Sequence, residues 1–126
     1  MQGTVLGRPT GGNQGGDNTT GENLKSGGGG GAGSEGVCDV NTYVSYGGDG
    51  RETNITGTPQ MMAAGGGGFM SPGGSGIGGA GIYLNNGADM WASPPAPNTG
   101  SGGGAGYNKQ VEPGSEGIVI VRVEVA

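Results

Sequence analysis

The sequence contains no histidine and only one cysteine, Cys38. Without histidine the chain cannot form a Ser-His-Asp triad, an imidazole general base or a histidine metal site. A single cysteine forms no internal disulfide, and Cys38 has no CxxC partner for metal or redox chemistry. The ten acidic side chains are dispersed along the chain, and no pair is placed for acid–base catalysis. We therefore expect no enzymatic activity, no metal site and no cofactor.

Hydrophobic and basic residues are also scarce. Hydrophobic residues make up 30% of the chain, against roughly 45–50% in a globular domain, so a conventional apolar core is expected to be small. The net charge is −5, from ten acidic and five scattered basic residues, which disfavours nucleic acid and anionic membranes as partners. No apolar run approaches the roughly 18 residues of a membrane span. Residues 1–4 lack the regions of a signal peptide, so we expect synthesis in the cytoplasm without secretion or membrane insertion.

Glycine, by contrast, is present in great excess. Of the 126 residues, 36 are glycine and 7 are proline, about a third of the chain. The glycines gather in blocks at residues 26–36, 63–81 and 100–106, without the strict period of a collagen triple helix. Inside a helix or an ordinary strand, each glycine costs about 0.5–1 kcal/mol relative to alanine. The blocks are therefore expected to form neither element.

Extended helices with three residues per turn offer a way to order such blocks. Their N–H and C=O groups all point outward, and glycine lets neighbouring backbones approach closely enough to bond laterally. Each hydrogen bond returns about 0.5–1.5 kcal/mol, while ordering each residue costs about 1–2 kcal/mol. A small number of apolar residues, called clamps below, are therefore expected to make the net free energy favourable. They are Met61, Met62, Phe69, Met70, Ile77, Ile82, Leu84 and the terminal strand.

We predict an all-β or irregular fold in which polyglycine-II-like helices pack as a slab, with a few short β-strands and almost no α-helix. The alternative is that the blocks are irregular loops on a small β-sheet. Residues 1–25 are polar and are read as an extended N-terminal arm, either a docking segment or a mobile tail. Residues 26–126 form the glycine-rich domain, which closes with a predicted strand at 117–125, where apolar and charged residues alternate in the second half.

Two groups of residues are candidates for contact with a receptor or partner. Trp91 follows Met90 on a loop that Pro94 and Pro95 stiffen, and tryptophan on a rigid loop is typical of contact surfaces. The alternative is that Trp91 covers the small core. The second candidate patch comprises Tyr43, Tyr46 and Arg51. The G-x-G-x-x-G matches at 31–36 and 76–81 precede no predicted helix, so they indicate composition rather than a dinucleotide site.

The glycine blocks and the closing segment carry a resemblance to a known class of proteins. The residues are the blocks at 27–31, 65–68, 73–81 and 100–106, and the run Gly117-Ile118-Val119-Ile120-Val121-Arg122. Together they resemble the glycine-rich domain of bacteriophage tail-fibre and tail-tip proteins, such as the distal adhesins of T-even-like phages. The resemblance implies a polyglycine-II sandwich on a virion, with the loops at 43–57 and 85–97 facing a host receptor.

From this resemblance we expect a non-enzymatic bacteriophage virion protein of the tail-fibre or tail-tip type. Its partners would be other virion proteins, a host surface receptor or further copies of the chain. The chain is short and has few glycine blocks, so a structural or decoration protein of the virion is the alternative. An ice-binding glycine-rich protein is the alternative from another class, and a thermal-hysteresis assay would identify it.

Overall fold

The computed structural model describes residues 13–17, 26–39, 41–42, 44–82, 84–85, 88–89, 92–106 and 111–125. Within the predicted arm, only residues 13–17 are therefore described. They lie along the first glycine block of the same chain, where the N–H of Asn13 donates to the carbonyl of Gly31 at 3.2 Å and that of Gly16 to Gly28 at 2.8 Å. Docking of the arm on another protein stays a prediction.

Regular elements are few and short in the described residues. Strand β1 (Arg51–Thr53) pairs antiparallel with β2 (Gln60–Met62), and β3 (Leu84–Asn85) pairs antiparallel with β4 (Ala88–Asp89). In register, Glu52 lies opposite Met61 in the first hairpin. One 3₁₀ turn, η1 (Gly74–Gly76), is the helical element of the described chain. The prediction of a few short strands and almost no helix is confirmed for these residues.

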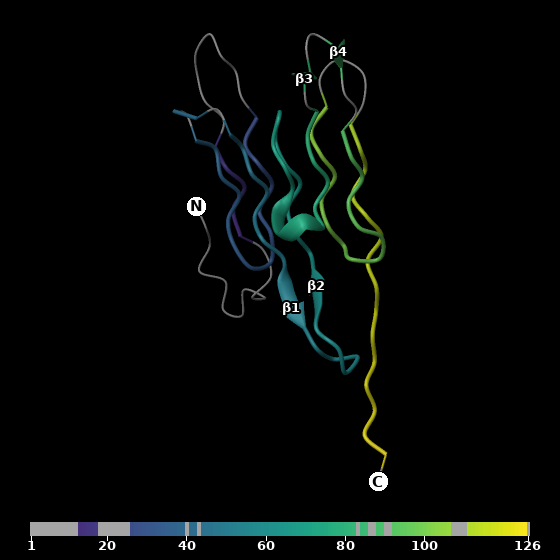
Figure 1. The fold of residues 1–126 in the computed structure, drawn as a ribbon. Coiled ribbons are helices and arrows are strands. Elements are labelled where there is room, and N and C mark those ends of the chain that lie inside the picture. Colours follow the sequence, from purple (N-terminus) through teal and green to yellow (C-terminus); the bar gives the residue numbers. More distant parts are fainter. Residues whose placement is uncertain are drawn as a thin grey trace.

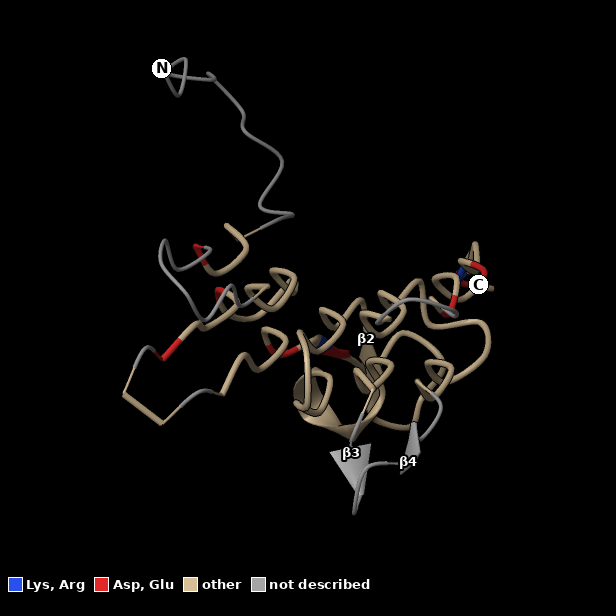
Figure 2. Ribbon diagram, turned by 90° about the horizontal axis from the view of Figure 1, so that it is seen from above, with Lys and Arg blue, Asp and Glu red and all other residues tan. Residues whose placement is uncertain are grey.

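Most of the chain consists of extended segments that run side by side along one direction (Figure 1). The β1–β2 hairpin projects from one end of this body, and β3 and β4 lie at the opposite end (Figure 1). Viewed along the segments, the chain appears as small coils seen end-on, and the coloured charges are spread rather than gathered (Figure 2). The loops therefore occupy the two ends of a body built from extended main chain.

Hydrogen bonds between these segments repeat at every third residue. The N–H groups of Gly65 and Gly68 donate to the carbonyls of Gly48 and Ser45, at 2.8 and 2.7 Å. The same spacing recurs between other antiparallel segments, where the N–H groups of residues 28 and 31 donate to the carbonyls of 37 and 34, those of 29 and 32 to 66 and 63, and those of 93 and 96 to 80 and 77. It recurs between parallel segments too, where the N–H groups of 102 and 105 donate to the carbonyls of 64 and 67, and those of 79 and 82 to 102 and 105. A β-ladder, by contrast, follows a two-residue repeat.

The segment at residues 63–68 lies at the centre of this network. Its N–H groups donate to two other segments, Gly65 to the carbonyl of Gly48 and Gly67 to that of Gly79. Its carbonyls accept from three segments: Gly66 from the N–H of Gly29, Gly65 from that of Gly74, and Gly67 from that of Ala105. Residues 64–68 are all buried, although four of them have no side chain. The middle of the protein is therefore filled by main chain.

Apolar side chains contribute less to the interior than expected. The buried hydrophobic residues of the described chain are Ala64, Ile82 and Ala92. Among the expected clamps, Ile82 is buried, Phe69 is half-buried and Met70 is 39% exposed. Glycine at the centre leaves room for neighbouring backbone but none for large side chains, so Phe69 and Met70 are only partly buried.

Serine hydroxyls supply acceptors where the network lacks a carbonyl. Ser71 Oγ accepts the N–H of Ser45 at 2.7 Å and donates to the carbonyl of Phe69 at 3.2 Å. Ser101 Oγ accepts the N–H of Ala64 at 3.2 Å. Every serine except Ser45 accepts a backbone N–H from another segment: Ser26, Ser34, Ser71, Ser75, Ser93, Ser101 and Ser115. The most buried side chains of the described residues are themselves serines, Ser45, Ser71 and Ser101, each 1% exposed.

The closing strand predicted at residues 117–125 is not formed. These residues continue out of the body, beyond the packed segments, as a single extended trace (Figure 1). No ladder includes them, and no backbone hydrogen bond joins them to the rest of the described chain. The segment has the composition of a strand, but the described part of the chain offers it no partner. It is called the tail segment below.

Two neighbouring glycines test whether backbone approach holds the body together. A Cβ at Gly28 would fall within 3.0 Å of the Tyr46 carbonyl, whereas the nearest atom to a Cβ at Gly29 would be 3.4 Å away, an ordinary contact. Gly28→Ala should therefore lower the free energy of unfolding by about 1–3 kcal/mol, as in overpacked cores. Gly29→Ala should leave it unchanged or raise it slightly. Urea denaturation measures both, and equal effects would contradict close approach as the cause.

The serine acceptors allow a second matched test. Ser71→Ala leaves the buried N–H of Ser45 without its partner, which should lower the free energy of unfolding by about 1–3 kcal/mol. Ser93 accepts the N–H of Ala80 at 3.0 Å from an exposed position, so water can replace its hydroxyl in Ser93→Ala. That control should change stability little, and thermal or urea unfolding of the two variants measures the difference.

Candidate functional site

Of the predicted contact residues, the structure describes Tyr46, Pro94 and Pro95 in extended segments and Arg51 at the start of β1. Tyr43, Met90 and Trp91 fall outside the described residues, so their roles stay predictions. The turn at residues 39–44 precedes a segment that leads into β1, which places this turn at the end opposite the β1–β2 hairpin. Strands β3 and β4 lie at that same end (Figure 1). The segments expected to face a receptor, 43–57 and 85–97, are not end loops throughout. Residues 44–53 run from the turn to β1, and residues 92–96 form an extended segment along residues 77–80.

The structure does not bring Tyr46 and Arg51 together. Tyr46 is 47% exposed, and its carbonyl accepts the N–H of Val37 at 2.9 Å. Arg51 is exposed at the start of β1, opposite Met62. Five extended residues at about 3.1 Å each separate them by about 15 Å along the segment. Any contact made by Tyr46 and one made by Arg51 would involve different regions of the molecule.

Pro94 and Pro95 lie between two residues whose N–H groups, three positions apart, bond to the neighbouring segment. The N–H of Ser93 donates to Ala80 at 3.0 Å, and that of Ala96 donates to Ile77 at 2.8 Å. The two prolines fill the positions between these donors, where the missing N–H of proline costs nothing. Pro94 is exposed and Pro95 is buried. The segment at 92–96 is thus both stiffened by proline and fastened to its neighbour.

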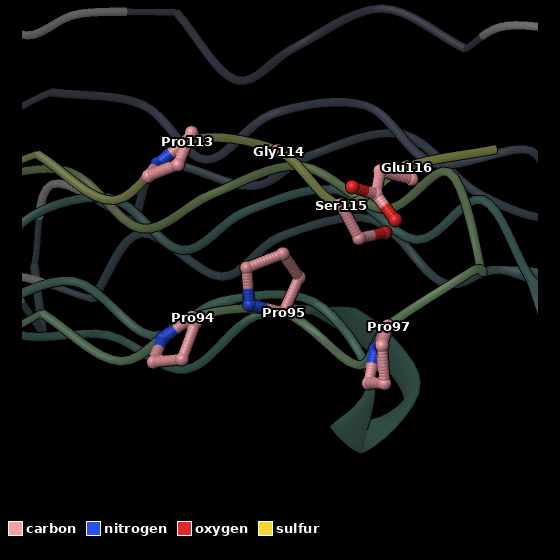
Figure 3. Close-up of a pocket in the computed structure, with 7 residues that line it drawn as sticks. All are labelled: Pro94, Pro95, Pro97, Pro113, Gly114, Ser115 and Glu116. Atoms are coloured by element: carbon pink, nitrogen blue, oxygen red, sulfur yellow. The ribbon is translucent and has the colours of Figure 1, made fainter.

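An open groove of about 250 Å³ lies between this segment and the one at residues 113–116. Its lining comprises Pro94, Pro95, Pro97, Pro113, Gly114, Ser115 and Glu116. Figure 3 shows the proline rings and the Glu116 carboxylate on facing segments around it. The proline rings offer apolar contact and the Glu116 carboxylate favours a positive charge, so the groove suits an apolar group that carries one.

Sequence reasoning identifies only one wall of this groove. Pro94 and Pro95 belong to the stiff loop that the sequence predicts, but the wall at 113–116 is not among the predicted contact residues. That wall is held in place because Ser115 Oγ accepts the N–H of Ser101 at 2.9 Å and the N–H of Gly100 donates to the carbonyl of Glu116 at 2.9 Å. The prolines at 94, 95, 97 and 113 are the available signal, although nothing in the sequence indicates that the two segments meet.

The turn before Tyr43 is held by a carboxylate. Asp39 Oδ2 accepts the Thr42 hydroxyl at 2.6 Å, and its Oδ1 accepts the N–H of Asn41 at 2.9 Å. The N–H of Asp39 also donates to the carbonyl of Val44 at 2.8 Å. The hydrogen bond from the Thr42 side chain, followed by that from the Asn41 backbone, holds the pKa of Asp39 below its ordinary value. The ionised carboxylate therefore favours the closed turn.

In the described residues, acidic side chains and Cys38 form no group that could hold a metal ion. Nor does the described part of the chain contain a helix long and apolar enough to cross a membrane. The described residues offer a proline-lined groove and exposed side chains such as Tyr46 and Arg51.

The Asp39 turn yields a prediction about pH. Because the pKa of Asp39 is lowered in the folded chain, its stabilising effect is present above the ordinary value of 3.8 and is lost as the pH falls below it. Thr42→Ala removes the main cause and should raise the pKa of Asp39 toward that value. An NMR titration of the carboxyl resonance measures the shift. Thr56→Ala, which changes a hydroxyl in the β1–β2 loop, is the control and should leave the titration unchanged.

Comparison with known proteins gives no further assignment. No family model matches the chain, no curated protein sequence matches it, and no solved structure matches it.

Proposed function

We propose that the chain is a non-enzymatic bacteriophage virion protein of the tail-fibre or tail-tip type. In this proposal a rigid glycine-packed body holds loops that attach the particle to the host surface. The observation that carries the proposal is the buried, hydrogen-bonded run at residues 64–68. A body whose interior is main chain keeps its shape whatever side chains its loops display. The sequence resemblance to phage fibre domains is the reason for assigning this body to a phage particle.

We further propose that the extended segments are polyglycine-II-like helices. A helix of this type has three residues per turn and bonds only to its neighbours. The spacing of donors and acceptors at every third residue, in both parallel and antiparallel pairs, supports this assignment. The several neighbours of segment 63–68 also support it, because a strand in a flat sheet bonds to two neighbours at most.

The two ends of the body suggest a division of roles. The end that carries β3, β4 and the turn at 39–44 adjoins Tyr43, Met90 and Trp91 in sequence, and we assign it to the host receptor. The opposite end carries the β1–β2 hairpin with Arg51 and the exposed tail segment. Exposed apolar residues mark surfaces that bind protein, so we assign this end to the particle.

Loop replacement in the particle tests these roles. A glycine–serine loop in place of residues 86–91 should lower host adsorption at least about tenfold, the loss expected from one buried aromatic anchor, without reducing particle number. The matched replacement of residues 54–58, in the hairpin at the other end, should instead reduce incorporation of the protein. Adsorption counts and protein content per particle measure the two effects.

The same experiment separates the second candidate, a structural or decoration protein of the virion. The exposed apolar tail segment favours this candidate because such a surface binds protein, whether another virion subunit or a second copy of the chain. If neither replacement alters adsorption and both reduce assembly, the decoration role is correct and the attachment role is not. Normal particles and normal adsorption after deletion of the whole protein would exclude both.

Hydrogen exchange tests the architecture independently of the role. If the segments form a polyglycine-II-like lattice, the amides of Gly65 and Gly67 should exchange slowly, because each donates inside the body at 2.8–2.9 Å. The amide of Gly117, in the exposed tail segment, serves as the fast reference, because it donates to no other backbone group of the described chain. Equal, fast exchange at all three positions would identify the glycine blocks as irregular loops.

A further inference from the structure

The tail segment is the most exposed apolar feature of the described chain. Val119, Val121, Val123 and Val125 are exposed by 91, 78, 74 and 94%. Ile118 is 53% exposed. Large exposed side chains on an extended, unpaired backbone form an open strand edge, which pairs readily with another chain. The segment is therefore available to pair with another strand.

Alternation along the tail segment defines two different faces. In a strand, the odd-numbered residues 119–125 would place four valines on one face. The even-numbered face carries Ile118 and Ile120, followed by Arg122 and Glu124. A pairing that keeps the valines together must therefore match odd positions with odd and even with even.

Charge then selects one pairing between two copies. Parallel, in-register pairing places Arg122 beside Arg122 and Glu124 beside Glu124, and like charges directly opposite are destabilising. Antiparallel pairing centred on Val123 places Arg122 of each copy opposite Glu124 of the other. It also sets Val121 opposite Val125. In this register the dimer contains two Arg122–Glu124 pairs, and the two copies are related by a two-fold axis.

We propose that the tail segment is a dimerisation strand, whose partner is the tail segment of a second copy of this chain. The two segments pair antiparallel over residues 121–125, with reciprocal Arg122–Glu124 contacts and a continuous valine face. Because the β1–β2 hairpin projects from the same end of the body, the dimer brings these two ends face to face (Figure 1). The inference does not depend on the attachment role.

Charge reversal tests both the dimer and its register. Sedimentation equilibrium of the full 126-residue chain at low salt should show a monomer–dimer equilibrium. Arg122→Glu and Glu124→Arg should each raise the dissociation constant about tenfold, because two charge pairs per dimer become like-charge contacts. The double reversal should restore dimerisation, since the facing side chains at positions 122 and 124 would again carry opposite charges. Rescue by the double variant is the result that a mere loss of solubility would not give.

A lysine scan supplies the matched control. Val123→Lys should abolish the dimer, because the two lysines would face each other at its centre. Val119→Lys introduces the same charge on the same face but lies outside the paired residues, so it should leave the dissociation constant unchanged. Thermal unfolding verifies that the body is intact in each variant. A chain that is monomeric throughout, that forms open-ended aggregates, or that responds equally to all these substitutions would overturn the proposal.

Discussion

Hydrogen bonds between one main chain and the next, repeated at every third residue, are the interaction on which this structure depends. They require that backbones approach without intervening Cβ atoms, and the run at 64–68 meets this requirement at the centre. The same requirement explains why larger apolar residues such as Met70 lie outside the glycine segments. It also explains why the loops gather at the two ends, since the sides of each segment are occupied by its neighbours.

The repeat of hydrogen bonds at every third residue explains the roles of several serines and prolines, which their residue type alone does not indicate. Ser71 and Ser101 accept an N–H where a carbonyl is missing, so they act as part of the main-chain network rather than as polar side chains in a core. Pro94 and Pro95 occupy positions whose N–H the register leaves unused. Glycine, serine and proline, which usually indicate loops, here serve one repeating structure.

The scarcity of helix and the short strands can be predicted from the sequence, because glycine excludes the helix and the β-branched residues near Val44 and Met61 are few. The stiffness of the segment at Pro94 and Pro95 can be predicted too. The groove cannot, because the contact between 94–97 and 113–116 depends on which segments become neighbours. The predicted strand at 117–125 is wrong for a related reason: alternation indicates what a segment can form, but not whether a partner is present.

The interior of main chain has a consequence for how the protein responds to temperature. Unfolding of an ordinary domain raises the heat capacity because it hydrates hydrocarbon, whereas newly hydrated polar groups lower it. Here the buried hydrophobic side chains of the described residues are Ala64, Ile82 and Ala92, and buried peptide groups replace the rest. The heat-capacity change per residue should therefore be small, and the free energy of unfolding should vary little over a wide range of temperature.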